Sequence, residues 1–241
     1  MRRFKVGFIG LGRIGSIRLR ICLGLEDVEI VGFFDSQAVG AEGITRFLSV
    51  EALLGQEGLD AVFISVPNRF TVPYAMEALK RGVSVFAEKP PGRTLAELKL
   101  LESFQDVRGG PTLMFGFNHR HKSGTKHLLE HVQEGTLGSV LWIRGRYGKE
   151  LEPEFFKGWR AQFDISGGGI LLDQGIHMVD LMRVIAGGFD EGHSVVSNRM
   201  TRLDGIEDNV FAIYRSRNSG ISASLHSTMI QWRHLFSFEV F

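Results

Sequence analysis

Three polar residues in the second half of the chain have types and spacings that suit acid–base chemistry. Asp173, His177 and Asp180 lie four and three residues apart in a largely apolar run that follows three consecutive glycines. In a helix, those intervals place the side chains on one face. A histidine beside a carboxylate is typical of a general base, because the imidazole takes the proton and the carboxylate orients it. We therefore expect this face to line a polar cleft.

A second group with possible chemistry is Glu88-Lys89-Pro90, which follows a short apolar run over residues 84–87. Ligands of open parallel sheets bind outside the carboxyl ends of the strands, so Lys89 would face a bound ligand there. An ammonium in that place can stabilise a developing alkoxide. The plainer interpretations are a surface lysine before a turn and, for His177, a buried histidine with one partner.

A metal site is another possible use of the same helix. Asp173 and His177, as carboxylate and histidine four residues apart, can share an ion, and His119, His121 or Asp180 could add a ligand. The spacing identifies no definite third ligand. We therefore predict no bound metal.

A glycine-rich turn near the N-terminus is suited to hold a cofactor. It reads Gly10-Leu11-Gly12-Arg13-Ile14-Gly15, between an apolar run over 4–9 and a helical stretch to about residue 25. In such turns the first glycine allows the bend, the second lets the backbone approach a pyrophosphate, and the third lets helix and strand pack closely. The plainer alternative is a glycine turn without a ligand.

Asp35 supports the dinucleotide interpretation, because it follows Gly15 by 20 residues at the end of a second apolar run over 28–34. A carboxylate there accepts hydrogen bonds from the ribose hydroxyls. It would repel a 2′-phosphate, and neither Ser36 nor Gln37 supplies a compensating cation. We predict a preference for NAD over NADP, which Arg13 near the phosphates could weaken.

Strands and helices alternate through the first half. Apolar runs over 61–66, 84–87 and 112–117 indicate buried strands, and helices are expected over 71–81 and from Thr94 to about Asp106. Thr94 and Glu97 have the spacing of a capping box. This alternation predicts an α/β fold with an N-terminal Rossmann domain, a doubly wound parallel sheet, over residues 1–118.

The second half of the chain has a different pattern of predicted helices and strands. A helix over 124–134 and an apolar run over 170–185 accompany short strands near 140–147, 194–200, 209–214, 221–226 and 234–241. Successive strands without intervening helices predict an antiparallel sheet. We expect residues 119–241 to form a substrate-binding α+β domain with an open, largely antiparallel sheet.

Composition excludes several classes of protein. A net charge of +1 gives no general attraction to nucleic acid or an anionic membrane. No apolar stretch is long enough to span a bilayer, and Lys5 and Arg13 interrupt the apolar N-terminus where a signal peptide would be apolar. The single cysteine, Cys22, cannot form an internal disulfide, so we expect a cytoplasmic protein.

Taken together, these motifs resemble the glucose–fructose oxidoreductase/inositol dehydrogenase (Gfo/Idh/MocA) family from Lys5 to Phe241. The resemblance is carried by the glycine turn, Asp35, the Glu-Lys-Pro turn, Gly116-Phe117-Asn118-His119-Arg120 and the run from Gly168 to His177. The Glu-Lys-Pro turn with the later Asp-x-x-x-His is more specific than the glycines. Asn118 to Arg120, with Trp159-Arg160 and Trp232, is most similar to members of surface-polysaccharide sugar metabolism.

The resemblance implies an NAD-dependent oxidoreductase that moves a hydride between the nicotinamide and a secondary alcohol of a sugar, cyclitol or nucleotide-sugar. It implies homo-oligomers formed through the C-terminal sheet. The implied catalytic residues are Lys89, Asp173 and His177. Cofactor contacts are expected from Gly10, Leu11, Gly12, Arg13, Ile14, Gly15, Asp35, Ser65, Val66, Pro67, Asn68, Glu88 and Lys89. Substrate contacts are expected from Lys89, Asn118, Arg120, Trp159, Arg160, Asp173 and His177.

The chain departs from the family pattern in three ways. Thr71 stands where a histidine is common, and little room exists between Asp35 and Leu48 for the usual second helix. The apolar run that ends at Phe241 lacks a closing turn, so we expect the second domain to be incomplete. A non-catalytic NAD-binding protein, or an inactive fragment of such an enzyme, is therefore the alternative.

Overall fold

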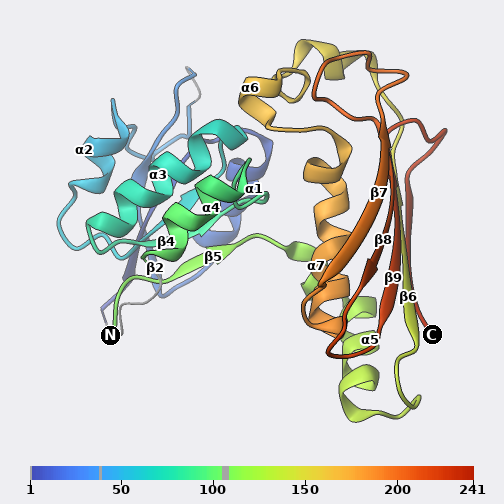
Figure 1. The fold of residues 1–241 in the computed structure, drawn as a ribbon. Coiled ribbons are helices and arrows are strands. Elements are labelled where there is room, and N and C mark those ends of the chain that lie inside the picture. Colours follow the sequence, from blue (N-terminus) through green and yellow to red (C-terminus); the bar gives the residue numbers. More distant parts are fainter. Residues whose placement is uncertain (1, 38–39, 105–108) are drawn as a thin grey trace. The chain divides into compact units, whose positions relative to one another are not determined.

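The computed structural model describes residues 2–37, 40–104 and 109–241. The chain divides into two compact units, Met1–Gly116 and Phe117–Phe241 (Figure 1). The predicted end of a helix at Asp106 lies outside the described residues.

The first unit contains a parallel sheet with strand order β2-β1-β3-β4-β5. Its strands are β1 (Phe4–Ile9), β2 (Val28–Phe34), β3 (Ala61–Ile64), β4 (Ser84–Ala87) and β5 (Leu113–Phe115). The chain moves outward from β1 to β2 and then returns to β3 on the other side. The carboxyl end of β1 therefore lies at the switch point where α/β sheets bind ligands, which confirms the predicted doubly wound fold.

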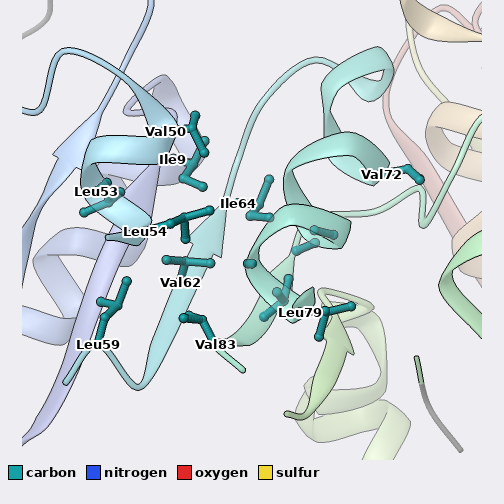
Figure 2. Packing of buried hydrophobic residues seen from close by; sticks show 14 of the residues in the cluster. Ile9, Val50, Leu53, Leu54, Leu59, Val62, Ile64, Val72, Leu79 and Val83 are labelled. Atoms are coloured by element: carbon teal, nitrogen blue, oxygen red, sulfur yellow. The ribbon is translucent and has the colours of Figure 1, made fainter. Parts of the chain in front are cut away.

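Helices cover both faces of this sheet: α1 (Arg13–Leu23), α2 (Val50–Leu54), α3 (Asn68–Lys80) and α4 (Leu95–Glu102). Leu19 and Cys22 of α1 are buried on one face. On the other face, Figure 2 shows Val62 and Ile64 of β3 packed between Leu54 of α2 and residues of α3. Thr94 caps α4, since its hydroxyl accepts from the Glu97 N–H at 3.2 Å.

Two details of the first unit correct or sharpen the predictions. Helix α3 begins at Asn68 rather than at Thr71, and Thr71 is buried within it. Between Asp35 and Leu48, the described residues form no helix, and α2 starts at Val50.

The second unit is built on a mixed sheet with strand order β10-β6-β9-β8-β7. Strands β6 and β9 are parallel and the other pairs are antiparallel, as the sequence predicted for a largely antiparallel sheet. The strands are β6 (Trp142–Gly148), β7 (Glu191–Ser197), β8 (Asn209–Arg215), β9 (Ser222–Thr228) and β10 (Leu235–Val240).

One face of this sheet is covered by α7 (Ile176–Ala186), whose Met178 and Met182 are fully buried. Gly145 on β6 permits this approach, because a Cβ there would lie 2.6 Å from the Met182 Cε. The remaining helical segments are η1 (Asn118–His121), α5 (Ser123–Glu134), η2 (Pro153–Lys157), η3 (Trp159–Ala161), α6 (Phe163–Ser166) and η4 (Leu171–Gly175).

The run over 170–185 is helical as expected, but its first part, η4, is a π-helical turn that leads into α7. The Glu207 carboxylate accepts from the N–H groups of Gly169 and Leu171 at 2.7 and 2.8 Å and so fixes the start of this turn. In the described parts of the chain, no helix combines the length and apolarity that crossing a bilayer requires.

Candidate functional site

The glycine turn at the end of β1 has the shape of a phosphate cradle. Gly10 has φ +88°, and a Cβ there would lie 2.4 Å from the Ser65 carbonyl oxygen. A Cβ on Gly15 would lie 2.0 Å from the Gly10 carbonyl oxygen, so helix and turn pack too closely for any side chain. A Cβ on Gly12, by contrast, would meet nothing within 4 Å among the described residues. The space beside Gly12 therefore fits a pyrophosphate, as the sequence predicts.

The first turn of α1 has the electrostatic character that an anion needs. In the described structure it carries no acidic residue, and Gly12 contributes no side-chain cap. The N-terminal N–H groups and the positive end of the helix dipole therefore point toward the cradle. Contacts of Arg13 and Ile14 with a cofactor stay predictions.

Asp35 links the end of β2 to the glycine turn. It is only 9% exposed, and its two carboxylate oxygens accept from the N–H groups of Leu11 at 2.6 Å and Gln37 at 2.7 Å. The carboxylate is therefore held in place before any ligand binds.

Arg46 is a neighbour of Asp35 that the sequence reasoning missed. Its guanidinium donates to the carbonyl oxygens of Asp35 at 3.1 Å and Gln37 at 2.9 Å, and a bridge pairs Arg46 with Phe33 of β2. Neither Ser36 nor Gln37 is a cation, as the sequence analysis notes, but Arg46 brings a guanidinium beside the backbone of Asp35. No local motif marks Arg46, because it reaches Asp35 through the bridge to β2.

The ends of β3 and β4 reach the same edge of the sheet as the glycine turn. The Ser65 N–H donates to the Ile9 carbonyl oxygen at 2.8 Å. The chain then passes through Val66 and Pro67 into α3, which begins at the buried Asn68. The Glu88 N–H donates to the Ile64 carbonyl at 2.9 Å. Lys89, which is half-buried, therefore follows β4 at the edge where ligands bind.

Glu88 has a partner that was not predicted. Arg18 of α1 donates to one oxygen of its carboxylate through Nε at 3.0 Å and a terminal nitrogen at 2.8 Å. This ion pair connects the first helix to the end of β4, which favours a structural role for Glu88; its cofactor contact stays a prediction.

In the second unit, Asp173 lies in the π-helical turn η4 and is held by two cations. Lys149 Nζ lies 2.9 Å from Oδ2 and Arg160 Nε lies 3.2 Å from Oδ1. Lys149, at the end of β6, was missed because it is 24 residues from Asp173. The two ion pairs hold the Asp173 carboxylate in place.

His177 lies at the start of α7 and is 5% exposed. Its ring stacks on that of His119 with centroids 4.2 Å apart and planes 21° apart. Asp180, one turn further along α7, accepts from Arg120 Nε at 2.7 Å and from a terminal nitrogen of the same guanidinium. Asp173 lies in the π-helical turn, whereas His177 and Asp180 lie in the regular α-helix that follows, so the α-helical spacing assumed from the sequence applies to His177 and Asp180.

Two other groups in this region have shifted pKa values. The hydrogen bonds to Asp180 raise the pKa of Arg120, so this guanidinium stays charged. Burial, and secondarily the charge of Asp173, raises the pKa of Tyr147 on β6. The Tyr147 ring centroid lies 6.4 Å from that of His177. Because its pKa is raised, the Tyr147 hydroxyl is neutral at neutral pH and can donate a hydrogen bond.

Four of the residues predicted to contact the substrate have different surroundings in the structure, namely Asn118, Arg120, Trp159 and Arg160. Arg160 stacks on Trp159 at 4.3 Å from the ring centroid while it bonds Asp173. Asn118 is exposed at the start of η1. Arg120 is engaged by Asp180, which favours a role in holding η1 against α7. Contacts of these four residues with a substrate stay predictions.

The arrangement of the histidines in this unit bears on the alternative of a metal site. In residues 2–37, 40–104 and 109–241, no three His, Cys, Asp or Glu side chains are grouped to hold an ion. His119 and His177 meet through their ring faces, whereas a metal binds the lone pair in the plane of the ring.

The first unit, with its strand order, its cradle at the switch point and Asp35 closing β2, is a Rossmann-type nucleotide-binding domain. Residues 4–109 match the model of the oxidoreductase family with an NAD-binding Rossmann fold, and residues 125–241 match that of the GFO/IDH/MocA C-terminal domain. The chain belongs to the Gfo/Idh/MocA family of oxidoreductases, which confirms the resemblance seen in the sequence.

Curated relatives are similar over much of this chain. Rhizopine catabolism protein MocA of Rhizobium meliloti is 26% identical, covering 83% of this chain and 63% of that protein. D-glucoside 3-dehydrogenase of Escherichia coli (strain K12) is 27% identical, covering 90% of this chain and 68% of that protein. Across such relatives the chain spans between 38% and 68% of their length.

Solved structures show the same fold. The WlbA dehydrogenase from Bordetella pertussis, in complex with NADH and UDP-GlcNAcA, has a TM-score of 0.90 at 22% identity, covering 99% of this chain and 75% of that one. Levoglucosan dehydrogenase, in complex with NADH and levoglucosan, has a TM-score of 0.88 at 23% identity, covering 99% and 71%.

Proposed function

We propose that this protein is an NAD-dependent dehydrogenase that oxidises, or in reverse forms, a secondary alcohol of a sugar, cyclitol or nucleotide-sugar. The observation that carries the proposal is the cradle of Gly10, Gly12 and Gly15 closed by Asp35 in a chain of this oxidoreductase family. Relatives named as glucoside, inositol and levoglucosan dehydrogenases favour this substrate class.

The roles proposed for individual residues are those that the family resemblance implies. When bound, the nicotinamide accepts or returns the hydride. His177 takes the proton of the substrate hydroxyl, and Lys89, at the carboxyl edge of the parallel sheet, stabilises the alkoxide. Asp173, fixed by Lys149 and Arg160, orients the substrate side of the site. Ser65 to Asn68 contact the nicotinamide side.

The alternative is a protein that binds NAD without catalysis. A binding module needs neither a buried imidazole such as His177 nor a carboxylate held by two cations such as Asp173. Reduction of NAD by the purified protein, with a panel of sugars, cyclitols and UDP-sugars, separates the two. Turnover with at least one compound is expected, whereas cofactor binding without turnover of any compound favours the alternative.

Cofactor selectivity is a prediction that depends on Asp35. NAD(H) should bind more tightly than NADP(H), because the buried carboxylate repels a 2′-phosphate. Asp35→Asn should narrow the difference between the affinities for NAD(H) and NADP(H), while the amide oxygen still accepts from the Leu11 N–H. Arg46→Ala should widen the difference between the two affinities, because the variant loses a cation beside Asp35 that could offset the charge of a 2′-phosphate. Calorimetric titration with both cofactors measures this, and equal or tighter binding of NADP(H) by the unmodified protein contradicts it.

We propose that the protein is a homo-oligomer that assembles through the sheet of the second unit. On the face opposite α7, Val195, Phe211 and Ile213 are exposed by 72%, 50% and 62% of their surface, and a group of exposed apolar side chains on neighbouring strands is typical of an interaction surface. Light scattering should give a dimer or larger species, and Ile213→Lys should shift it toward monomer. A monomer at all concentrations contradicts the proposal.

We also propose a cytoplasmic location. The one cysteine of the sequence, Cys22, is buried in α1, and burial raises the pKa of its thiol. A buried, protonated thiol with no disulfide partner suits a reducing compartment.

A further inference from the structure

We propose that His119 is a positioning residue for His177, and that the two stacked imidazoles together carry at most one positive charge, so that the pair is neutral before His177 accepts a proton. This inference rests on the proposed role of His177 as the proton acceptor. The ring centroids are 4.2 Å apart with planes 21° from parallel, and the two residues are only 4% and 5% exposed. Two buried imidazolium ions at this separation repel strongly, so the second proton is disfavoured.

The contact belongs to a rigid arrangement between two elements. His119 and Arg120 are consecutive residues of η1, and they contact His177 and Asp180, which lie three residues apart on α7. Two neighbouring contacts, a ring stack and a bidentate ion pair, thus hold η1 against α7. The His177 ring therefore cannot tilt without displacing His119.

Aromatic residues also pack around the stacked pair. Phe117 meets His177 edge-on at 6.0 Å, and Phe236 of β10 lies 4.9 Å from His119. Tyr147 of β6 lies 5.4 Å from His119. These apolar rings supply little polar solvation for a second charge, whereas the face of a neutral imidazole stabilises one neighbouring cation.

Charged and titratable groups lie next to the aromatic rings that contact the pair and on the same helical elements. Lys122 lies 4.5 Å from the Phe236 ring, and the exposed His234 lies 5.5 Å from the Tyr147 ring. The anions Asp173 and Asp180 are each bonded to cations, namely Lys149 with Arg160 and Arg120. Both of these carboxylates are therefore already paired with cations, which weakens the support that their negative charges give to a second imidazolium ion.

The consequence for the reaction is a defined proton balance. The proton released by the substrate hydroxyl bonds to His177, and His119 stays neutral with its ring face against the new cation. If His119 already carries a proton, His177 cannot readily accept another. His119 therefore sets the protonation state in which His177 acts, without touching the substrate.

Two variants separate stacking from proton sharing. His119→Ala removes the ring and should lower kcat by about 10²-fold with little change in KM, because the acceptor is no longer held in place. His119→Phe keeps a ring in the stack and should recover most of kcat. His121→Phe is the matched control, because His121 is exposed in the same short helix and should behave as the unmodified protein.

Proton sharing is measured without turnover, by NMR titration of the full chain with labelled histidine imidazoles. The signals of His119 and His177 should both shift when the pair takes up its first proton. The second proton should be taken up in a separate step, at a pH at least about one unit lower. In His119→Phe, His177 should show one simple step. Independent titration of the two rings, or an unchanged kcat in His119→Ala, would overturn the inference. Absence of any turnover would contradict the proposed function and leave the titration result standing.

Discussion

His177→Ala should lower kcat for alcohol oxidation by about 10²–10⁴-fold while the affinity for NAD stays nearly unchanged. The imidazole is the proposed proton acceptor, whereas the cradle and Asp35 belong to the other unit of the chain. The pH profile of kcat/KM should rise through one ionisation in the unmodified protein, and the variant should lose it. Steady-state kinetics with cofactor binding measured separately provides the test.

Lys89 variants show whether the assignment of the acceptor is right. Lys89→Ala should be severely impaired and Lys89→Arg less so, because the arginine keeps a cation with a different geometry. The effects of removing Lys89 and His177 should not add, since both are proposed to act on one oxygen. Near-normal turnover in His177→Ala together with an inactive Lys89→Ala would make Lys89 the proton acceptor instead.

Gly15→Ala should both destabilise the first unit and abolish measurable NAD binding. The added Cβ would lie 2.0 Å from the Gly10 carbonyl oxygen and 3.4 Å from the Ser65 Cβ, and a backbone clash cannot be relieved by a side-chain rotation. Forced overpacking of this kind costs about 1–3 kcal/mol or more of the free energy of unfolding. Thermal unfolding and cofactor titration measure the two effects.

Gly12→Ala is the matched control for this substitution. A Cβ on Gly12 meets no described atom within 4 Å, and Gly12 has φ −61°, which alanine adopts readily. This variant should unfold like the unmodified protein yet bind NAD more weakly, because its methyl group enters the space proposed for the pyrophosphate. A stable Gly15→Ala protein that binds NAD normally would contradict the assigned cradle.

Features of the fold that depend on local chemistry could be predicted from the sequence. Thr94 caps its helix through the Glu97 N–H three residues away, so spacing alone places it correctly. The glycine turn and Asp35 directly follow the first two strands, so the apolar runs locate them, although the Leu11 N–H that donates to Asp35 is 24 residues away. The mixed sheet of the second unit followed from successive short apolar runs, although its one parallel pair, β6 with β9, carries no local signal.

The partners of the site residues could not be predicted, because long-range packing brings them together. Arg18 lies 70 residues from Glu88, and Arg120 lies 60 residues from Asp180. The π-helical turn at Asp173 is stabilised by the Glu207 carboxylate from 38 and 36 residues away. Helical spacing was a sound guide only within α7, where the backbone is a regular α-helix.

Hydride transfer itself is the most direct test of the central proposal. The full chain is incubated with NAD and a substrate found in the panel, carrying deuterium on the carbon of the oxidised alcohol, and the reduced cofactor is examined by mass spectrometry. The proposed dehydrogenase transfers the deuterium to the nicotinamide. Reduced cofactor without deuterium, or cofactor that binds but is never reduced by any sugar, cyclitol or nucleotide-sugar, contradicts the proposal.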